Sequence, residues 1–313
     1  MSSPASPYNT VGALQVGVLI SMFLFGIATL QAHVYVRKFA EDPLVVKLMV
    51  LIVWTLELAH TVAVSNGLYF MVVAQYTNPQ ANVVQDLDPG FRIAVLFSGC
   101  IAASVQAYFT HRLRVVSGKL AIPIAFYILA AMRFVGWVWA SIMATVSMQP
   151  PGEAHAHAGW AWPFVPLLAG GAVVDVTLAA LVCIHFSQSR AKAGINAPLM
   201  DKLMLWTIQN GLLTGLAGLT TAICLITMRD NYIWVAVFLI LTRLFSNSFM
   251  ASLNARQHLR RYRHQHNAST DPILPYHMKK PSYGDTSYSG PGIQAPVYLR
   301  SDTPSSTYTL IPS

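Results

Sequence analysis

The stretch that decides the fold class is VGALQVGVLISMFLFGIATLQAHVYVRK, residues 11–38. Its apolar part, residues 11–36, contains no Asp, Glu, Lys or Arg. About 20 such residues in a helix that rises 1.5 Å per residue cross a hydrocarbon core of about 30 Å. Six more apolar stretches of similar length follow, at residues 48–74, 93–112, 120–146, 161–186, 203–227 and 231–254. The sequence therefore predicts an all-α polytopic membrane protein, built as a seven-transmembrane-helix bundle.

The composition excludes an ordinary soluble domain. Of the 313 residues, 54% are hydrophobic and only 10% are charged, and the mean hydropathy is +0.49. Soluble domains carry about 25% charged residues. The net charge of +8 does not require nucleic acid as a partner, because the positions of the basic residues have another explanation.

Basic residues lie almost entirely on alternate connections between the apolar stretches. One side has Arg37, Lys38, Lys47, Arg112, Arg114, Lys119, Arg190, Lys192, Lys202, Arg256, Arg260, Arg261 and Arg263. The other side has only Arg92 and Arg229. Because short cytoplasmic loops are enriched in Lys and Arg, the pattern predicts a short extracellular N-terminus, residues 1–10, and a cytoplasmic C-terminus. We expect the plasma membrane or another membrane of the secretory pathway.

A polar segment, residues 257–313, follows the predicted seven-helix domain of residues 11–256. It is rich in Ser, Thr, Tyr, Pro and His and has no apolar run of helical length. A segment of this composition cannot bury enough apolar surface to offset the entropy of ordering it. We therefore predict a disordered cytoplasmic tail, to which a cytoplasmic partner could bind.

Four ionisable side chains fall near the middle of the predicted helices: Glu57, Arg133, Asp175 and Arg243. A charge at the bilayer centre costs roughly 2.5 to 3.5 kcal/mol on insertion scales, so such side chains usually face the bundle interior and pair. The sequence does not say which acid meets which base. His60 follows Glu57 by about one helical turn, so this pair is interpreted either as a proton relay or polar ligand site, or as a hydrogen bond between helices.

Uncharged polar residues accompany them inside the predicted helices: Gln31, Gln106, Gln209, Asn210, Asn247 and Asn254. Such groups commonly hold membrane helices together, at about 0.6 kcal/mol each, so we interpret most of them as packing contacts, with ligand binding as the alternative. Asn247 joins the charged residues as a candidate for the functional site. Two His and one Glu in the loop near residue 155 are too few ligands to indicate a metal, so we expect no metal and no cofactor.

Several stretches carry a resemblance that covers nearly the whole bundle. They are FGIATLQ at 25–31, DPLVVKLMV at 42–50, YTNP at 76–79, VQAYFTHRL at 105–113 and NSFMASLNAR at 247–256. The chain resembles an uncharacterised, mostly basidiomycete fungal family of seven-helix membrane proteins with a domain of unknown function. That family often has Asp where Glu57 stands and Tyr where Phe245 stands. The resemblance implies a membrane location and seven helices, but no established activity.

Three function classes fit these observations. A retinal protein is excluded because residues 231–254 contain no Lys for a Schiff base. The motifs of rhodopsin-like receptors are missing too, since the chain reads YFTHR at 108–112 and NSFMA at 247–251. We rank a receptor-like or sensory bundle that binds a small molecule first, and a small-molecule or proton-coupled transporter or channel second. An intramembrane enzyme is last, because no catalytic motif occurs.

Overall fold

The computed structural model describes residues 11–77, 89–118, 120–146, 163–193, 197–228 and 231–270. This part of the chain forms helices and contains no strand. The helices are α1 (Ala13–Lys38), α2 (Leu44–Thr77), α3 (Pro89–Ser117), α4 (Ala121–Val146), α5 (Phe164–Ala193), α6 (Ala197–Thr227) and α7 (Ile233–Thr270). Each is long and apolar enough to cross a membrane, so the predicted all-α, seven-span architecture is confirmed.

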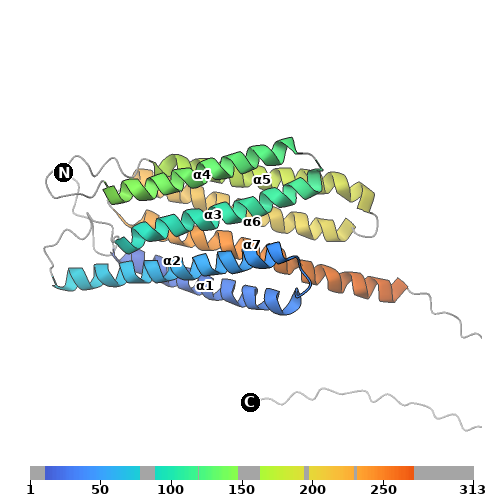
Figure 1. The fold of residues 1–313 in the computed structure, drawn as a ribbon, viewed down its shortest axis with the longest axis horizontal. Coiled ribbons are helices and arrows are strands. Elements are labelled where there is room, and N and C mark those ends of the chain that lie inside the picture. The colour runs from blue at the N-terminus through green and yellow to red at the C-terminus, as the bar shows by residue number, and fades with distance from the viewer. Residues whose placement is uncertain are drawn as a thin grey trace, which may run out of the picture. The chain divides into compact units, whose positions relative to one another are not determined.

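Successive helices run in opposite directions and lie side by side (Figure 1). We call the end of the bundle where α1, α3 and α5 finish the basic end, because Arg37, Lys38, Arg112 and Arg114 lie there. Which end faces the cytoplasm remains the prediction made from the basic residues.

Helix α7 is longer than the apolar stretch that predicted it. It continues to Thr270, although the sequence pattern placed the start of a disordered tail at Gln257. No Gly or Pro interrupts residues 257–270, and the first proline after them is Pro272, which disfavours a helical conformation at the residue before it. The predicted start of the tail is therefore too early, and residues 271–313 lie outside the described part of the chain.

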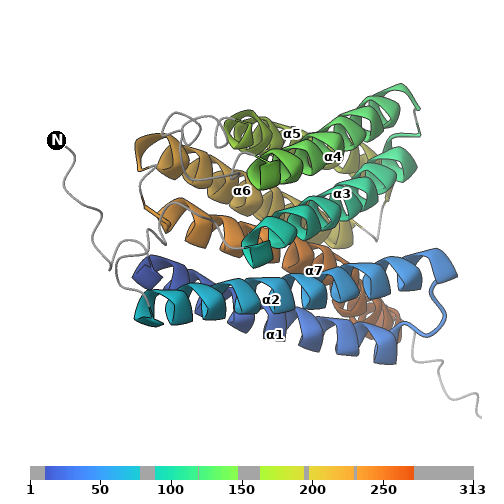
Figure 2. The ribbon, with the colours of Figure 1, turned by 60° about the vertical axis from the view of Figure 1, so that its left-hand side comes forward.

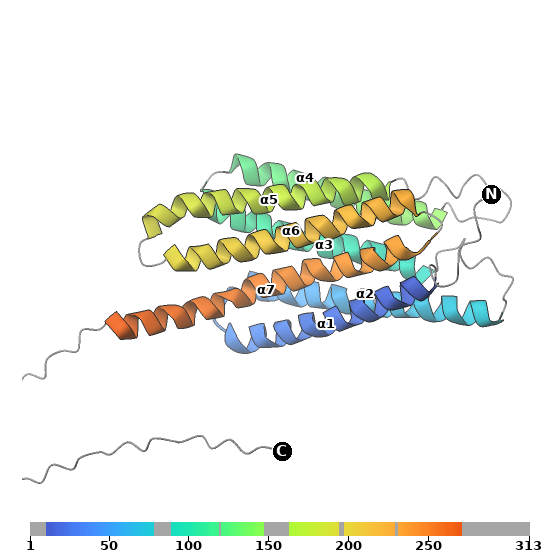
Figure 3. The same ribbon diagram turned by 180° about the vertical axis from the view of Figure 1, so that it is seen from behind.

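The interior of the bundle is organised around α7. In its apolar segment 72% of the residues are buried, against 28% in the corresponding segments of α1, α2 and α4. Figures 2 and 3 show α7 between the α1–α2 pair and the helices α3 and α6. A helix buried on most sides must satisfy its polar groups inside the protein, so the polar residues of α7 find partners on several neighbours.

Large apolar side chains cover the outside of the bundle. Phe23, Val62, Val135 and Leu216 are each at least 60% exposed, and they come from four different helices. Exposed apolar area costs about 25 cal/mol per Å² in water, and contiguous patches of this extent are rare on soluble proteins. A lipid bilayer is therefore the environment that this surface fits.

Helices α1 and α7 run parallel and are joined by repeated amide contacts. The Asn247 side chain donates from Nδ2 to the Leu24 carbonyl at 3.1 Å, and Asn254 donates in the same way to the Gln31 carbonyl at 2.8 Å. Both donors and both acceptors are seven residues apart, which is about two helical turns, so the same face of each helix is used twice. Asn247, Asn254 and Gln31 thus join helices, and Gln31 does so through its backbone carbonyl.

Candidate functional site

One charged cluster joins α1, α2 and α7 around Arg243. Its guanidinium forms an ion pair with the Glu57 carboxylate. Nε donates to the Ser21 hydroxyl at 2.8 Å, Nη1 to the Glu57 backbone carbonyl at 3.1 Å, and Nη2 to the Thr61 hydroxyl at 2.9 Å. The Ser246 hydroxyl donates to Oε1 of the Glu57 carboxylate, whereas Arg243 pairs with Oε2. Every guanidinium nitrogen therefore has a partner.

This cluster is closed to solvent. Arg243 is 0% exposed and Glu57 is 1% exposed. A buried pair whose hydrogen bonds are satisfied can remain charged, whereas either partner alone would carry an uncompensated charge. We call the Glu57–Arg243 cluster the lock, because its geometry fits a structural contact between three helices.

His60 lies near the lock on α2 but does not take part in it. It is 0% exposed, and within the described residues neither ring nitrogen has a hydrogen-bond partner. The helix-to-helix contact considered for the Glu57 and His60 pair is therefore made by Glu57 alone, through Arg243 and Ser246 of α7. The proton relay or polar ligand site at this pair stays a prediction.

A second charged cluster joins α3, α4 and α5 around Arg133. Nη1 lies 3.3 Å from Asp175 Oδ1 and 3.5 Å from Gln106 Oε1. The guanidinium also lies over the Phe245 ring of α7, 5.5 Å from its centroid. Gly171 leaves room for it, because a Cβ at that position would be 2.3 Å from Arg133 Nη2. Asp175 therefore pairs with Arg133 and Glu57 with Arg243, which the sequence left undecided.

The second cluster is only partly satisfied. Its contacts are at the long end of the hydrogen-bond range, and the Arg133 and Asp175 side chains are 9% and 11% exposed. Arg133 Nε and Gln106 Nε2 are buried, and neither has a hydrogen-bond partner among the residues that the structure describes. A buried donor without a partner costs about 1–3 kcal/mol, so these atoms favour the arrival of another polar group.

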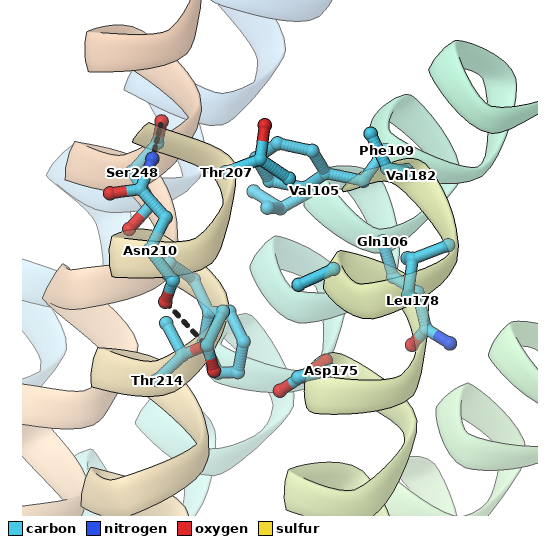
Figure 4. A pocket seen from close by; sticks show the side chains of 13 residues that line it. Val105, Gln106, Phe109, Asp175, Leu178, Val182, Thr207, Asn210, Thr214 and Ser248 are labelled. Carbon is cyan, nitrogen blue, oxygen red and sulfur yellow. Dashed lines mark hydrogen bonds between the residues drawn. The ribbon is translucent and has the colours of Figure 1, made fainter. Parts of the chain in front are cut away.

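A cavity adjoins this cluster between α3, α5, α6 and α7. It has a volume of about 40 Å³, measured as the space open to the centres of water molecules, which is room for a few waters or a small polar molecule. Figure 4 shows the Asp175 carboxyl pointing from α5 toward Asn210 and Thr214 on α6. The lining residues are Val105, Gln106, Phe109, Asp175, Leu178, Ala179, Val182, Thr207, Asn210, Gly211, Thr214, Phe245 and Ser248.

The lining combines an apolar wall with a few polar groups. The Asn210 amide donates only a long bond, 3.4 Å, to the Ser248 carbonyl, and it has a second N–H. Small-molecule sites are typically apolar cavities with a small number of oriented polar groups. This cavity, with the Asp175–Arg133 pair at its edge, is the candidate functional site.

The predicted polar residues divide between the cavity and other surroundings. Gln106 and Asn210 line the cavity, whereas Gln209 is exposed on the outside of α6. Gln209 points about 100° away from Asn210 on α6, and in this structure that step turns it out of the cavity. Gln209 is therefore not a packing residue in this bundle. Glu153, His155 and His157 lie outside the described residues.

Several lining residues were not singled out in the sequence, and two of them are polar residues with no earlier role. Thr207 and Ser248 lie on the faces of α6 and α7 that border the cavity. Thr207, Asn210 and Thr214 are spaced three and four residues apart, the repeat of one helical face. That repeat would have indicated a polar stripe on α6.

At the basic end, two arginines connect α7 to other parts of the bundle. Arg112 on α3 donates from Nη1 to the Ser252 hydroxyl on α7 at 2.9 Å. Arg256 on α7 pairs with Asp42, which follows α1, at 2.5 Å, and Asp42 also accepts a bond from the Tyr35 hydroxyl at 3.0 Å. The stretch 247–256 is therefore bonded to α1, α3, α6 and the α1–α2 connection.

Comparison with known protein families identifies one region of the chain. Residues 171–258 match DUF6534, a family of unknown function. No curated protein and no solved structure matches the chain. The domain of unknown function expected from the resemblance is thus present in this region.

The DUF6534 region runs from within α5 to within α7. It contains Asp175 and Arg243, whereas Glu57, Arg133 and Gln106 lie before it. Three of the four helices that line the cavity therefore contribute their lining residues from the DUF6534 region, and α3 supplies the rest.

Proposed function

We propose that this integral membrane protein is a receptor-like or sensory bundle that binds a small molecule in the cavity between α3, α5, α6 and α7. The observation that carries the proposal is the unsatisfied Asp175–Arg133 cluster at the edge of that cavity. Buried polar groups without partners are uncommon in folded proteins, and a ligand that supplies the missing bonds would gain affinity from them. We also propose that the protein resides in the plasma membrane or another membrane of the secretory pathway. The resemblance implies a fungal origin.

Signal transfer would use the helices that the ligand touches. Gln106 and Arg112 lie on α3, and Ser248 and Ser252 lie on α7, so the cavity and the Arg112–Ser252 hydrogen bond share both helices. A ligand that changes the α3–α7 spacing would alter this bond at the basic end. Helix shifts of about 1–2 Å are typical of such transitions. In the predicted orientation this end is cytoplasmic, where a partner would sense the change.

The alternative is a transporter or channel. It is favoured by one observation, a partly exposed carboxylate–guanidinium pair beside a cavity within the membrane-spanning region. Carboxylates in such surroundings commonly bind or release protons in carriers. The lock offers no such route, because both of its charged side chains are fully enclosed.

The coupling experiment needs no identified ligand. Val182 lines the cavity and is 0% exposed, so Val182→Phe would occupy part of the cavity permanently. Val173→Phe is the matched control, since Val173 lies on the same helix but is 66% exposed on its outer surface. Spin labels replace Val115 on α3 and Leu205 on α6, both exposed near the basic end, in a cysteine-free background.

We expect Val182→Phe to shift the distance between the two labels, and Val173→Phe to leave it unchanged. Identical distance distributions in all three proteins would contradict the receptor-like proposal. Proton and ion flux in proteoliposomes, compared between the wild type and Asp175→Asn, distinguishes the alternative. Flux that is lost in Asp175→Asn would favour a carrier or channel over a receptor.

A further inference from the structure

The charge balance of the cavity limits the class of its ligand. Asp175 is the one ionisable side chain among the described residues that line the cavity, and Arg133, which does not line it, already compensates its charge. A cationic or anionic ligand would bring a charge without a counterion into a region where ionised groups are costly. The cavity therefore favours an uncharged molecule.

The free hydrogen-bonding capacity specifies the polar group of that molecule. Arg133 contacts Asp175 through Oδ1, and a carboxylate can accept about four hydrogen bonds, so Asp175 can accept from a ligand. The nearby amides offer donors. A guanidinium only donates, so Gln106 must turn its oxygen toward Arg133, which leaves Nε2 without a partner. Asn210 keeps a second N–H beyond its long bond to Ser248.

A hydroxyl is the simplest uncharged group that meets both requirements. It donates its proton to Asp175 and accepts from one of the two amides, whereas a carbonyl only accepts and an alkane does neither. The rest of the molecule would lie against Val105, Phe109, Leu178, Val182 and Phe245, which are apolar. The space open to the centres of water molecules is about 40 Å³, which suits a short hydrocarbon chain.

From this geometry we infer that the cavity binds a small uncharged alcohol, with its hydroxyl at Asp175 and its hydrocarbon part among the apolar lining residues. The inference rests on the proposed function, since it names the ligand class of the same site. The alcohol reaches the cavity either from water or from the bilayer, where a long-chain alcohol would place only its hydroxyl end inside.

The test compares four probes of similar size with different polar groups: 1-butanol, butylamine, butyrate and pentane. Each is added to the full-length protein in nanodiscs, and the thermal unfolding midpoint is measured, because a ligand that binds only the folded state raises it. Val182→Phe is the control. A probe that acts only on the bilayer changes the unfolding midpoint of both proteins, whereas a probe that binds in the cavity changes only that of the wild type. We expect 1-butanol to raise the midpoint of the wild type but not that of Val182→Phe, and the other probes to raise neither.

A charge change gives a second readout. Asp175→Asn leaves Arg133 without its counterion, so an anion should bind better relative to the alcohol. We expect the dissociation constant of butyrate, divided by that of 1-butanol, to fall roughly tenfold. Gln209→Leu, at an exposed position, is expected to change neither constant. If Asp175→Asn does not fold, the wild-type ranking of the four probes still tests the inference.

Stronger binding of butylamine, butyrate or pentane than of 1-butanol by the wild type would overturn the inference. If no probe binds but Val182→Phe still changes the label distance, the inference fails and the proposed function stands. If the label distance is also unchanged, both fail. 1-Dodecanol shows whether the alcohol enters the cavity from water or from the bilayer. Binding as strong as that of 1-butanol identifies entry from the bilayer, and weaker binding identifies entry from water.

Discussion

Replacing Arg243 by Met should destabilise the protein far more than the same change at Arg133. Arg243→Met removes three donated hydrogen bonds and leaves the Glu57 carboxylate, 1% exposed, without its counterion. Breaking a buried ion pair in this way costs about 3–5 kcal/mol. The Arg133 pair is longer, at 3.3 Å, and both side chains are partly exposed, so we expect about 1–2 kcal/mol there.

The free energy of unfolding is measured by titrating the micelle-bound protein with dodecyl sulfate and following tryptophan fluorescence. The double variant Glu57→Gln, Arg243→Met serves as a control, because it removes both charges and leaves mainly lost hydrogen bonds. We expect it to be about 2 kcal/mol more stable than Arg243→Met alone, because the unpaired buried carboxylate is gone. An Arg243→Met variant as stable as Arg133→Met, or a double variant less stable than Arg243→Met, would refute the distinction between a closed lock and a partly satisfied site.

Three further predictions concern helix packing and use the same unfolding assay. Gly17→Ala should cost about 1–3 kcal/mol, because its Cβ would be 2.6 Å from α7 backbone and side-chain atoms, whereas Gly26→Ala, with nothing within 4 Å, should cost nothing; equal effects would contradict the close α1–α7 contact. Asn254→Leu should cost about 0.6 kcal/mol through its lost bond to α1. Gln209→Leu, on the lipid-facing surface, should not destabilise, and a larger loss there would place that amide in a contact. A fourth prediction concerns the cavity and is read from 1-butanol binding: Gly171→Ala should displace the neighbouring guanidinium and weaken that binding, and unchanged binding would show that the ion pair is not needed.

The helix count could be predicted from the sequence because each apolar stretch is long enough to span a membrane on its own. The pairing of charges could not, since it depends on how each helix is rotated about its axis and on which helices are neighbours. Glu57 and Asp175 have similar depth and similar chemistry in the sequence, yet one is enclosed and the other borders a cavity. Depth along a helix is local information, whereas burial is a property of the assembled bundle.

The separation of Gln209 from Asn210 has the same origin. Composition indicates two adjacent amides inside a span, and only the orientation of α6 decides that one faces the cavity while the other is exposed. The end of α7 shows a different limit. Polarity predicted the end of the membrane segment, but a helix can continue into a polar segment as long as no Gly or Pro interrupts it.

The central claim is that the Asp175–Arg133 side of α7 is open to small molecules while the lock side is closed. Two serines on α7 report on it directly: Ser248 lines the cavity, and Ser246 donates to Glu57 in the lock, although both are at most 5% exposed. The measurement is the rate at which a small uncharged methanethiosulfonate modifies Ser248→Cys and Ser246→Cys, each in a cysteine-free background. We predict rapid modification of Ser248→Cys that 1-butanol slows, and little modification of Ser246→Cys. Equal rates at the two positions, or a faster rate at Ser246→Cys, would contradict the claim.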